Sequence, residues 1–457
     1  MGFAENQTTV TLMRKIHIAR PDSRQVKVRN GEQQPVAKAI YETLSEQKVD
    51  EWRAVTGYNK RKRLCTAWRL LITVIIAFLS GDTLGFASLR AVFVSRFGPI
   101  ESSAFQNRLK QEAAAKFFQL ALSEFVRAVV SKAGLSLAGA LGCYDDVRVY
   151  DATCERLPPR GRGTMPACAK DKAGAKMLVG YSLKTGLAEE AVCEAQTSAE
   201  LPMWHALVPT FARNVLYLFD LGYFEKAIFT GALNAGADVL MRLKSKTRIT
   251  VTGLATPTGI TPLPRWSHLT FLRSVSRKRG SLYDLDVVWG KATDGIQLRL
   301  VGYAHRYNKV RWYLTTASRE KLTAQEVVEA YRLRWLIELL FREIKQSTDL
   351  GRSFTANEHA VRALSYGAML AHAIVRSIRI ATALSNDVPL HELRPLACLR
   401  MIRACAHTLA EALERQIPSG WRRLFETLSG HFVYFAREKQ PSRSRPRIAL
   451  NLGACGA

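Results

Sequence analysis

The segment NVLYLFDLGYFEKAIFTGALNAGADVLMRLK, residues 214–244, decides the fold class of this chain. NVLYLFD is a short apolar run that is typical of a strand buried on both faces. LGYFEKAIFTGALNAG predicts a helix, and ADVLMRLK predicts a further strand. A strand, a helix and a strand in this order indicate an α/β layer architecture.

Three more strands are expected upstream of this segment. VRVYDAT, residues 147–153, alternates and contains β-branched side chains, which favours a strand. KMLVGYSL (176–183) and EEAVCEAQ (189–196) predict two more strands joined by a hairpin turn, and residues 199–213 suit a helix. The expected order is therefore three strands, a helix, a strand, a helix and a strand.

The region that follows changes in character. Residues 245–317 are rich in Thr, Val, Arg and Pro and carry repeated turn signals, so they predict a β-rich insertion. Strands are expected in it at 270–277, 282–290, 296–305 and 310–317. Helical periodicity resumes at Thr323 and continues to Lys345, and a further helix is expected from His359 to Leu384.

The charge of the chain points to a polyanionic partner. Its 457 residues carry 66 Lys and Arg against 39 Asp and Glu, a formal net charge of +27, and a hydrophobic content of 47% excludes a disordered chain. A nucleic acid would remove the self-repulsion of such a chain, whereas a basic ribosome-associated or membrane-surface protein is the alternative. The apolar run from Leu70 to Leu79 is shorter than the ~20 residues that a membrane span needs, so no membrane is expected.

Helical patterns flank the α/β region on both sides. Apolar residues recur at three- and four-residue spacing within residues 60–135, which follow the basic cluster NKRKR at Asn59–Arg63. The C-terminal part contains the basic stretch PSRSRPR, residues 441–447. We therefore expect a helical N-terminal DNA-binding region over 1–140, a core over 141–385 with the insertion at about 245–317, and a helical C-terminal region with a basic tail over 386–457.

Three acids occupy positions where carboxylates can converge. Asp151 lies on the first predicted strand, Asp220 ends the strand of residues 214–220, and Glu338 lies in the middle of a helix. Each alone is more often a turn residue, a helix cap or half of a solvated ion pair. Together they can hold hard divalent cations, Mg²⁺ or Mn²⁺, and two such ions suit phosphodiester cleavage.

The helical stretch YRLRWLIELLFREIK, residues 331–345, adds cations to one of these acids. At about 3.6 residues per turn, Tyr331, Arg334, Glu338 and Lys345 fall on one helix face. An ion-pair stripe would look the same, but the leucines and isoleucines of this stretch already supply a core-facing side. The face is therefore predicted to meet DNA phosphate, with Arg334 and Lys345 on backbone oxygens.

The spacing Y-x2-R-x3-E-x6-K resembles the signature of the insertion-sequence-4 family of DDE transposases, with Tyr331, Arg334, Glu338 and Lys345 in register. VYDAT around Asp151 and LFDLGY around Asp220 are also similar to this family's aspartate motifs, and the resemblance covers about residues 60–385. It implies a ribonuclease-H-like mixed-sheet catalytic core with a β-rich insertion.

The resemblance also implies chemistry and partners. Asp151, Asp220 and Glu338 would be both catalytic and metal-binding residues, with Mg²⁺ as cofactor and Mn²⁺ as a possible substitute. Tyr331, Arg334 and Lys345 would bind the transposon end. Trp312 stands where some members stack a flipped base, although a core Trp on a strand is an equally good interpretation.

The implied function is cut-and-paste DNA transposition in the cytoplasm, associated with the bacterial nucleoid. The partners would be double-stranded DNA, as transposon ends and as target, and a second copy of the chain in a synaptic homodimer. Two alternatives remain open: a metal-dependent nuclease or resolvase on the same fold, and an inactive transposase-derived repressor that binds DNA ends without magnesium.

Overall fold

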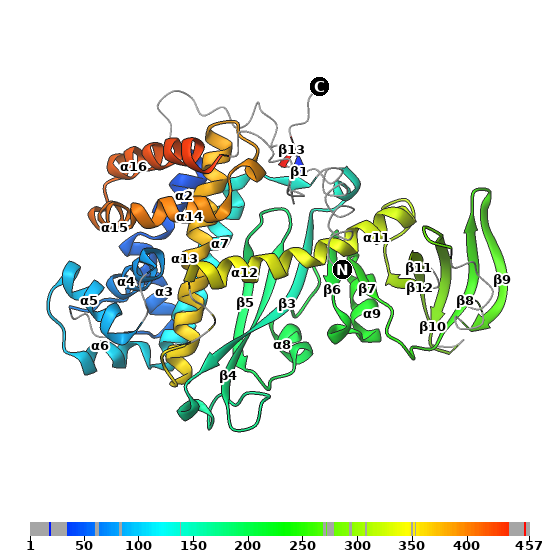
Figure 1. The fold of residues 1–457 in the computed structure, drawn as a ribbon, viewed down its shortest axis with the longest axis horizontal. Coiled ribbons are helices and arrows are strands. Elements are labelled where there is room, and N and C mark those ends of the chain that lie inside the picture. The colour runs from blue at the N-terminus through cyan, green and yellow to red at the C-terminus, as the bar shows by residue number, and fades with distance from the viewer. Residues whose placement is uncertain are drawn as a thin grey trace. The chain divides into compact units, whose positions relative to one another are not determined.

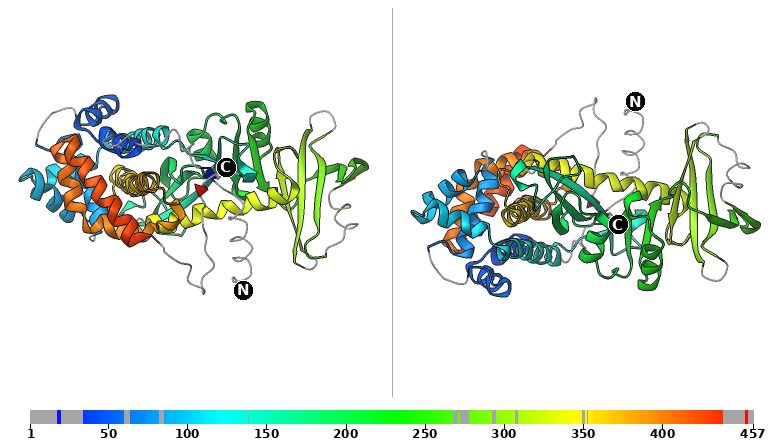
Figure 2. Two further views of the ribbon diagram at one scale, coloured as in Figure 1. Left: turned by 90° about the horizontal axis from the view of Figure 1, so that it is seen from above. Right: turned by 90° about the horizontal axis from the view of Figure 1, so that it is seen from below.

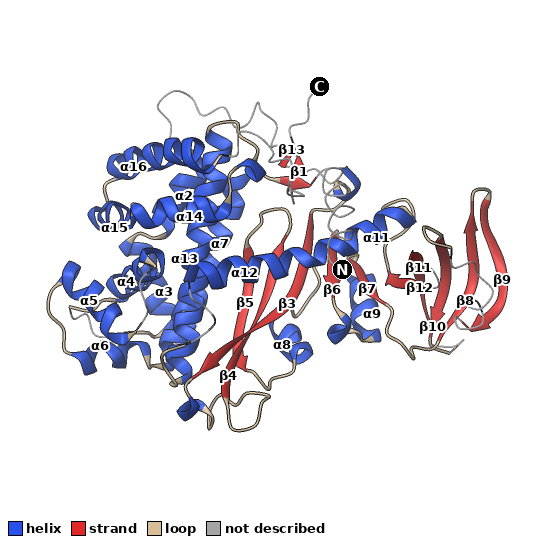
Figure 3. Cartoon of the chain, viewed as in Figure 1, coloured by secondary structure: helices blue, strands red, loops and turns tan. Residues whose placement is uncertain are grey.

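The computed structural model describes residues 18–19, 34–59, 64–81, 85–137, 139–267, 271, 278–291, 295–306, 309–348, 351, 353–437 and 452–453. Its helices and strands are labelled in Figures 1 and 3. The chain divides into two compact units. Unit 1 comprises Met1–Ile18, Ser136–Asp151 and Glu200–Ile337, and unit 2 comprises Ala19–Leu135, Ala152–Ala199 and Glu338–Ala457. Most of the basic cluster at 59–63 and the whole stretch at 441–447 lie outside the described residues.

A ten-stranded mixed sheet has the order β5-β4-β3-β6-β7-β12-β11-β10-β8-β9. In chain order, its first five strands are β3 (Asp146–Leu157), β4 (Ala173–Ser182), β5 (Ala188–Ala195), β6 (Val215–Phe219) and β7 (Asp238–Arg242). β6 runs parallel to the start of β3 and β7 runs parallel to β6, whereas β4 and β5 are antiparallel. The expected α/β fold class with a mixed sheet is confirmed.

The segment from Val215 to Arg242 follows the expected order, with one correction. All five residues of β6 are buried, as the apolar run predicts. The helix does not begin directly after Asp220, because the Asp220 side chain accepts a hydrogen bond from the Gly222 amide and forms a 3₁₀ turn, η3, at Leu221–Tyr223. Helix α9 (Lys226–Ala235) begins after this turn and packs against β7.

The β-rich insertion is confirmed and consists of five antiparallel strands (Figure 2). These are β8 (Ile249–Thr256), β9 (Gly259–Ser267), β10 (Leu282–Trp289), β11 (Ile296–Arg306) and β12 (Lys309–Thr315). β12 also pairs with β7, which joins the insertion to the central sheet of unit 1. The hairpin of β8 and β9 was not expected, and the strand expected at 270–277 lies outside the described residues except for Phe271.

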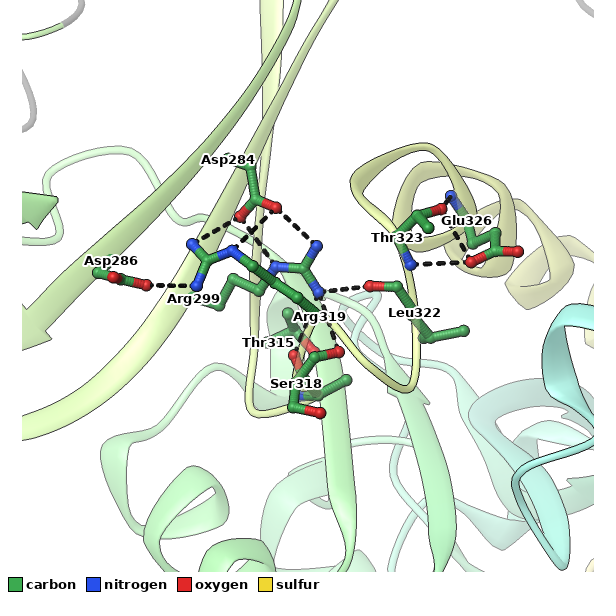
Figure 4. Close-up of polar contacts among 10 residues, drawn as sticks. Asp284, Asp286, Arg299, Thr315, Ser318, Arg319, Leu322, Thr323 and Glu326 are labelled. Atoms are coloured by element: carbon green, nitrogen blue, oxygen red, sulfur yellow. Dashed lines mark hydrogen bonds and ion pairs between the residues drawn. The ribbon is translucent and has the colours of Figure 1, made fainter. Parts of the chain in front are cut away.

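A buried ion network closes the base of this insertion (Figure 4). Arg299 on β11 donates two hydrogen bonds to the Asp284 carboxylate on β10, at 2.9 and 2.8 Å. Its remaining Nη1 donates to the carbonyls of the loop after β12, at Ala317, Ser318 and Leu322. Every polar side of the guanidinium is therefore bonded within the fold.

The other helices of unit 1 are α8 (Glu200–Leu207) and α11 (Ala324–Arg332), which is followed by the 3₁₀ turn η4 (Leu333–Trp335). Helix α12 (Leu336–Thr348) begins in unit 1 and continues in unit 2. Shorter pieces are β1 (Ile18–Ala19), β2 (Ser136–Leu137), β13 (Leu452–Gly453), η1 (Gly139–Leu141), η2 (Pro159–Gly161), η5 (Leu390–Glu392) and the π-helix η6 (Phe432–Ala436).

Unit 2 is mainly helical, which confirms the helical flanks of the core. Its N-terminal helices are α2 (Pro35–Thr43), α3 (Glu46–Thr56), α4 (Ala67–Ser80), α5 (Phe86–Phe97), α6 (Ser102–Leu109) and α7 (Glu112–Ala133). Its C-terminal helices are α13 (Glu358–Ser385), α14 (Pro395–Ala404), α15 (Ala406–Arg415) and α16 (Pro418–His431). The domain boundaries at residues 140 and 385 stay a prediction.

Helix α13 forms the centre of this unit and packs along α7 and α4 (Figure 1). In the described part of the chain, it is the one helix long and apolar enough to cross a membrane, and 94% of its apolar window is buried inside the protein. The core helix of a soluble protein has the same length and composition.

Candidate catalytic site

Asp151 and Arg334 are paired in unit 1. Asp151 lies on β3, and its Oδ2 accepts a hydrogen bond from Nη1 of Arg334 at 3.1 Å. Each side chain is 21% exposed, so the pair is partly shielded from water. The sequence assigned Asp151 to metal and Arg334 to DNA, whereas the structure brings these two residues together.

Asp220 directly follows the carboxyl end of β6, the strand that pairs with β3. Its Oδ1 accepts the Gly222 amide at 2.7 Å. A Cβ on Gly222 would lie 3.0 Å from this Oδ1 and 3.9 Å from Oε2 of Glu200, the first residue of α8. Asp220 and Glu200 therefore face each other across a glycine that leaves room for both carboxylates.

The pKa of the buried Tyr223 hydroxyl reflects the carboxylates near it. Its side chain is fully buried, and burial raises the pKa of its hydroxyl well above the ordinary value. Three nearby carboxylates raise this pKa further, those of Glu200, Asp151 and Asp220. The buried hydroxyl thus lies within electrostatic range of three carboxylates of unit 1.

Glu200 is the member of this set that the sequence did not identify. An acid in the first turn of a helix commonly interacts with the helix dipole. The position of Glu200 at the start of the expected helix at 199–213 therefore did not mark it as a site residue. Only its distance from Gly222 sets it apart.

Tyr331 connects the signature helix to Asp220. The side chain is 9% exposed, and its ring lies 5.1 Å from the ring of Tyr313 on β12. Burial raises the pKa of Tyr331 to about 12, against the lowering effect of Arg334 and Arg242, and Asp220 raises it as well. The predicted DNA-binding residue Tyr331 therefore lies within electrostatic reach of a predicted catalytic aspartate.

Glu338 and Lys345 belong to α12 in unit 2, where Glu338 is half-buried and Lys345 is exposed. The uninterrupted α-helix expected between Tyr331 and Lys345 is wrong in one detail, because η4 interposes a 3₁₀ turn at Leu333–Trp335. A 3₁₀ turn has 3.0 residues per turn, so it changes the angular relation between Tyr331 and Glu338. Convergence of Glu338 with the two aspartates stays a prediction.

Trp312 lies within an aromatic row on the insertion. It is paired across the sheet with Gly302, and its ring lies directly over the position that a Gly302 side chain would occupy. It stacks on Tyr283 with ring centroids 5.9 Å apart and meets Phe271 edge-on. The half-buried ring is thus packed on one sheet face, and its role in stacking a DNA base stays a prediction.

The donor chemistry of the three acids in unit 1 fits a hard divalent cation. Carboxylate oxygens are the ligands that Mg²⁺ and Mn²⁺ prefer, and all three carboxylates influence the pKa of the buried Tyr223 hydroxyl. Among the described residues, no three His, Cys, Asp or Glu side chains already stand close enough together to hold a metal ion. Asp151 and Asp220 are instead engaged by Arg334 and the Gly222 amide.

Comparisons with known proteins place this chain in a family. A family model described as the transposase DDE domain matches residues 144–374, a segment that includes Asp151, Asp220 and Glu338. No curated protein matches the chain. A cryo-EM structure of the piggyBac transposase synaptic complex with hairpin DNA aligns at 12% identity and a TM-score of 0.47, over 93% of this chain and 89% of that one. Because the family model spans just over half of the sequence, the chain belongs to the family of proteins with a transposase DDE domain.

Proposed function

We propose that this protein is the DNA transposase of an insertion sequence of the insertion-sequence-4 family, which binds terminal inverted repeats and carries out metal-dependent strand cleavage and strand transfer. One observation carries the proposal: Asp151, Asp220, Arg334 and Tyr331 gather in unit 1, so two acids and two residues suited to a DNA backbone share one region. The family membership supports the same chemistry.

The proposed roles follow from the side chains. Asp151, Asp220 and Glu338 would hold Mg²⁺ or Mn²⁺, which when bound supply an activated water and neutralise charge on the phosphodiester. Tyr331, Arg334 and Lys345 would orient the backbone of the transposon end, and Trp312 would stack a displaced base. Gly222 keeps the space beside Asp220 open, since a side chain there would crowd its Oδ1.

The proposed partners are the transposon ends, the target DNA and a second copy of the chain. The net charge of +27 suits binding to double-stranded DNA. Two ends must be held together before they are joined, and this need motivates a homodimer in the synaptic complex. A cytoplasmic protein associated with the bacterial nucleoid would meet both kinds of DNA.

A cleavage and joining assay tests this function directly. The substrate is duplex DNA from the flanks of the gene, incubated with the full chain and either Mg²⁺ or EDTA. We expect cleavage and strand joining with Mg²⁺ only, and loss of both in Glu338→Ala with DNA binding retained. Glu329→Ala is the matched control, because Glu329 is an acid on α11 that is bonded to the nearby Gln325 side chain.

The outcomes separate the rival functions. Cleavage without joining would favour the nuclease or resolvase, and end binding without any magnesium dependence would favour the repressor. Full activity in Glu338→Ala would remove Glu338 from the catalytic set and leave the other acids to be tested in its place.

A further inference from the structure

Four side chains on neighbouring strands of unit 1 form a basic and aromatic surface. Arg242 on β7 stands directly opposite Tyr313 on β12, and Arg311 on β12 stands directly opposite Tyr303 on β11. Directly opposed residues share a sheet face, and so do residues two apart on one strand, as Arg311 and Tyr313 are. All four therefore project from the same face, whereas Trp312 projects from the other.

Helix α11 covers part of this face and adds a third arginine. It packs against β7, β10 and β11. The Arg332 guanidinium lies 5.9 Å from the centre of the Tyr303 ring, and the Tyr331 ring lies 5.1 Å from that of Tyr313. We call this set the arginine–tyrosine face: Arg242, Arg311, Arg332, Tyr303, Tyr313 and Tyr331.

The three arginine charges of this face all act on the buried hydroxyl of Tyr313. Burial raises the pKa of Tyr313, and three guanidinium groups oppose this shift, those of Arg311, Arg332 and Arg242. Within the described ranges, neither Arg242 nor Arg332 forms an ion pair with a carboxylate. The like charges of Arg242 and Arg332 repel each other, and an anion placed between them would remove the repulsion.

Arg332 gives a second and independent indication of a missing acceptor. Its Nη1 is buried and has no hydrogen-bond partner among the described residues. Buried donors in folded proteins are nearly always bonded, so this nitrogen calls for a ligand oxygen. A guanidinium is well suited to phosphate oxygens, which it can bind through two parallel hydrogen bonds.

We propose that the arginine–tyrosine face binds the sugar–phosphate backbone of a DNA strand next to Asp220. Three guanidinium groups on three separate elements exceed what a single phosphate needs and match a chain of phosphates. Tyr331 belongs both to this face and to the surroundings of Asp220, so a strand bound here passes beside the acids. The inference rests on the proposed transposase function and adds residues outside the signature to it.

The salt dependence of DNA binding tests this inference. Fluorescence anisotropy would follow the full chain binding to a labelled duplex from the gene flanks over a range of KCl concentrations. We expect Arg242→Gln, Arg311→Gln and Arg332→Gln each to reduce the slope of log affinity against log salt by about 0.9, the value for one phosphate contact. The weakening should be similar for duplexes of unrelated sequence.

Two further variants keep the test decisive. Arg248→Gln removes an exposed arginine that precedes β8 outside this face, and it should leave the slope nearer to the wild-type value. Arg332→Lys keeps the charge but not the paired donors, so it should keep the slope and weaken binding. Thermal melting would confirm that each variant is folded.

Two outcomes would overturn the inference. Wild-type slopes in all three folded glutamine variants, with magnesium-dependent cleavage intact, would show that the strand lies elsewhere while the transposase function stands. A wild-type chain that binds no DNA at any salt concentration would remove the proposed function and this inference together.

Discussion

Two groups of arginines in unit 1 are used in opposite ways. Arg299 at the base of the insertion is buried, and its donors are consumed by Asp284 and by three backbone carbonyls (Figure 4). Arg332 lies over the Tyr303 ring, and one of its buried nitrogens has no acceptor in the described residues. The same side chain thus closes the fold in one place and, in our proposal, binds a DNA strand in the other.

The pair of Asp151 and Arg334 stands between these extremes. Its Arg334 Nη1 donates to Asp151 Oδ2 at 3.1 Å between side chains that are each 21% exposed, whereas Arg299 makes a more deeply buried, bidentate contact with Asp284. Such a contact can be exchanged at modest cost, because partly exposed ion pairs contribute little net stability. The arginine contacts of unit 1 therefore differ in how easily they exchange: the bidentate contact of Arg299 with Asp284 is part of the fold, and the contact of Arg334 with Asp151 is exchangeable.

The largest effect on stability is expected in the buried ion network around Arg299. Asp284→Ala removes the carboxylate that accepts from both Arg299 and Arg319 and leaves the buried Arg299 guanidinium without a counter-charge. The free energy of unfolding should fall by roughly 3–5 kcal/mol, measured by urea denaturation. Asp286→Ala is the control, since Asp286 bonds only the outer side of Arg319 and is 33% exposed, and its loss should stay below about 1 kcal/mol. Equal losses would contradict this distinction between contacts.

A second closed network in unit 2 should give a pH-dependent effect. Glu343 on α12 accepts hydrogen bonds from Arg376 and His372 on α13. Burial alone would raise the pKa of Glu343, but the charge of Arg376 and the hydrogen bond from His372 outweigh it and hold that pKa well below its usual range. Burial lowers the pKa of His372.

Both shifts act in the same direction on stability. A carboxylate with a lowered folded pKa stabilises the fold above its unfolded value of about 4.3, and this stabilisation is lost as the pH falls through the folded value. A histidine with a lowered folded pKa favours the unfolded chain once the pH falls below about 6.5. Glu343→Gln should cost roughly 3 kcal/mol at pH 7 in chemical denaturation, and the gap to wild type should narrow in acid. A gap that is constant with pH would show that Glu343 is not ionised in the fold.

A smaller effect is expected at the acids around Tyr223. Glu200→Gln removes one carboxylate that faces Asp220, and it should weaken Mn²⁺ binding by roughly tenfold, the lower end of the effects seen for residues that support metal ligands. Titration of Mn²⁺ followed by electron paramagnetic resonance would measure the free ion. Glu329→Gln is the control, and an equal affinity in both variants would remove Glu200 from the site.

The smallest effect is expected at the exchangeable pair. Arg334→Gln frees Asp151 from a cation, so the DNA-free protein should bind Mn²⁺ about twofold to fivefold more tightly, although its affinity for DNA falls. The same titration measures this, with Arg248→Gln as the control for a general loss of positive charge. An unchanged or lower Mn²⁺ affinity would mean that Arg334 does not compete with the cation.

Local pattern was enough for most of the elements. The apolar run before Asp220 and the alternation around Asp151 predicted β6 and β3, because burial and pleat impose their periods on the nearest residues. The turn after Asp220 was missed, since a side-chain hydrogen bond to Gly222 outweighed helical periodicity there. The β8–β9 hairpin was missed although β8 alternates between buried and half-buried residues, because the Gly and Pro residues of this segment were interpreted as turn signals.

The residue pattern alone predicted the order of β3 to β7 and the helices between them, the basic character of the chain and the candidates Asp151, Asp220, Tyr331 and Arg334. Only the tertiary structure decided that Arg334 bonds Asp151, that Glu200 faces Asp220, and that Arg242 stands opposite Tyr313. The physical reason is that periodicity reports which way a side chain points within its own element. Its neighbours on other elements depend on strand register and helix packing, which are set by contacts between residues far apart in the chain.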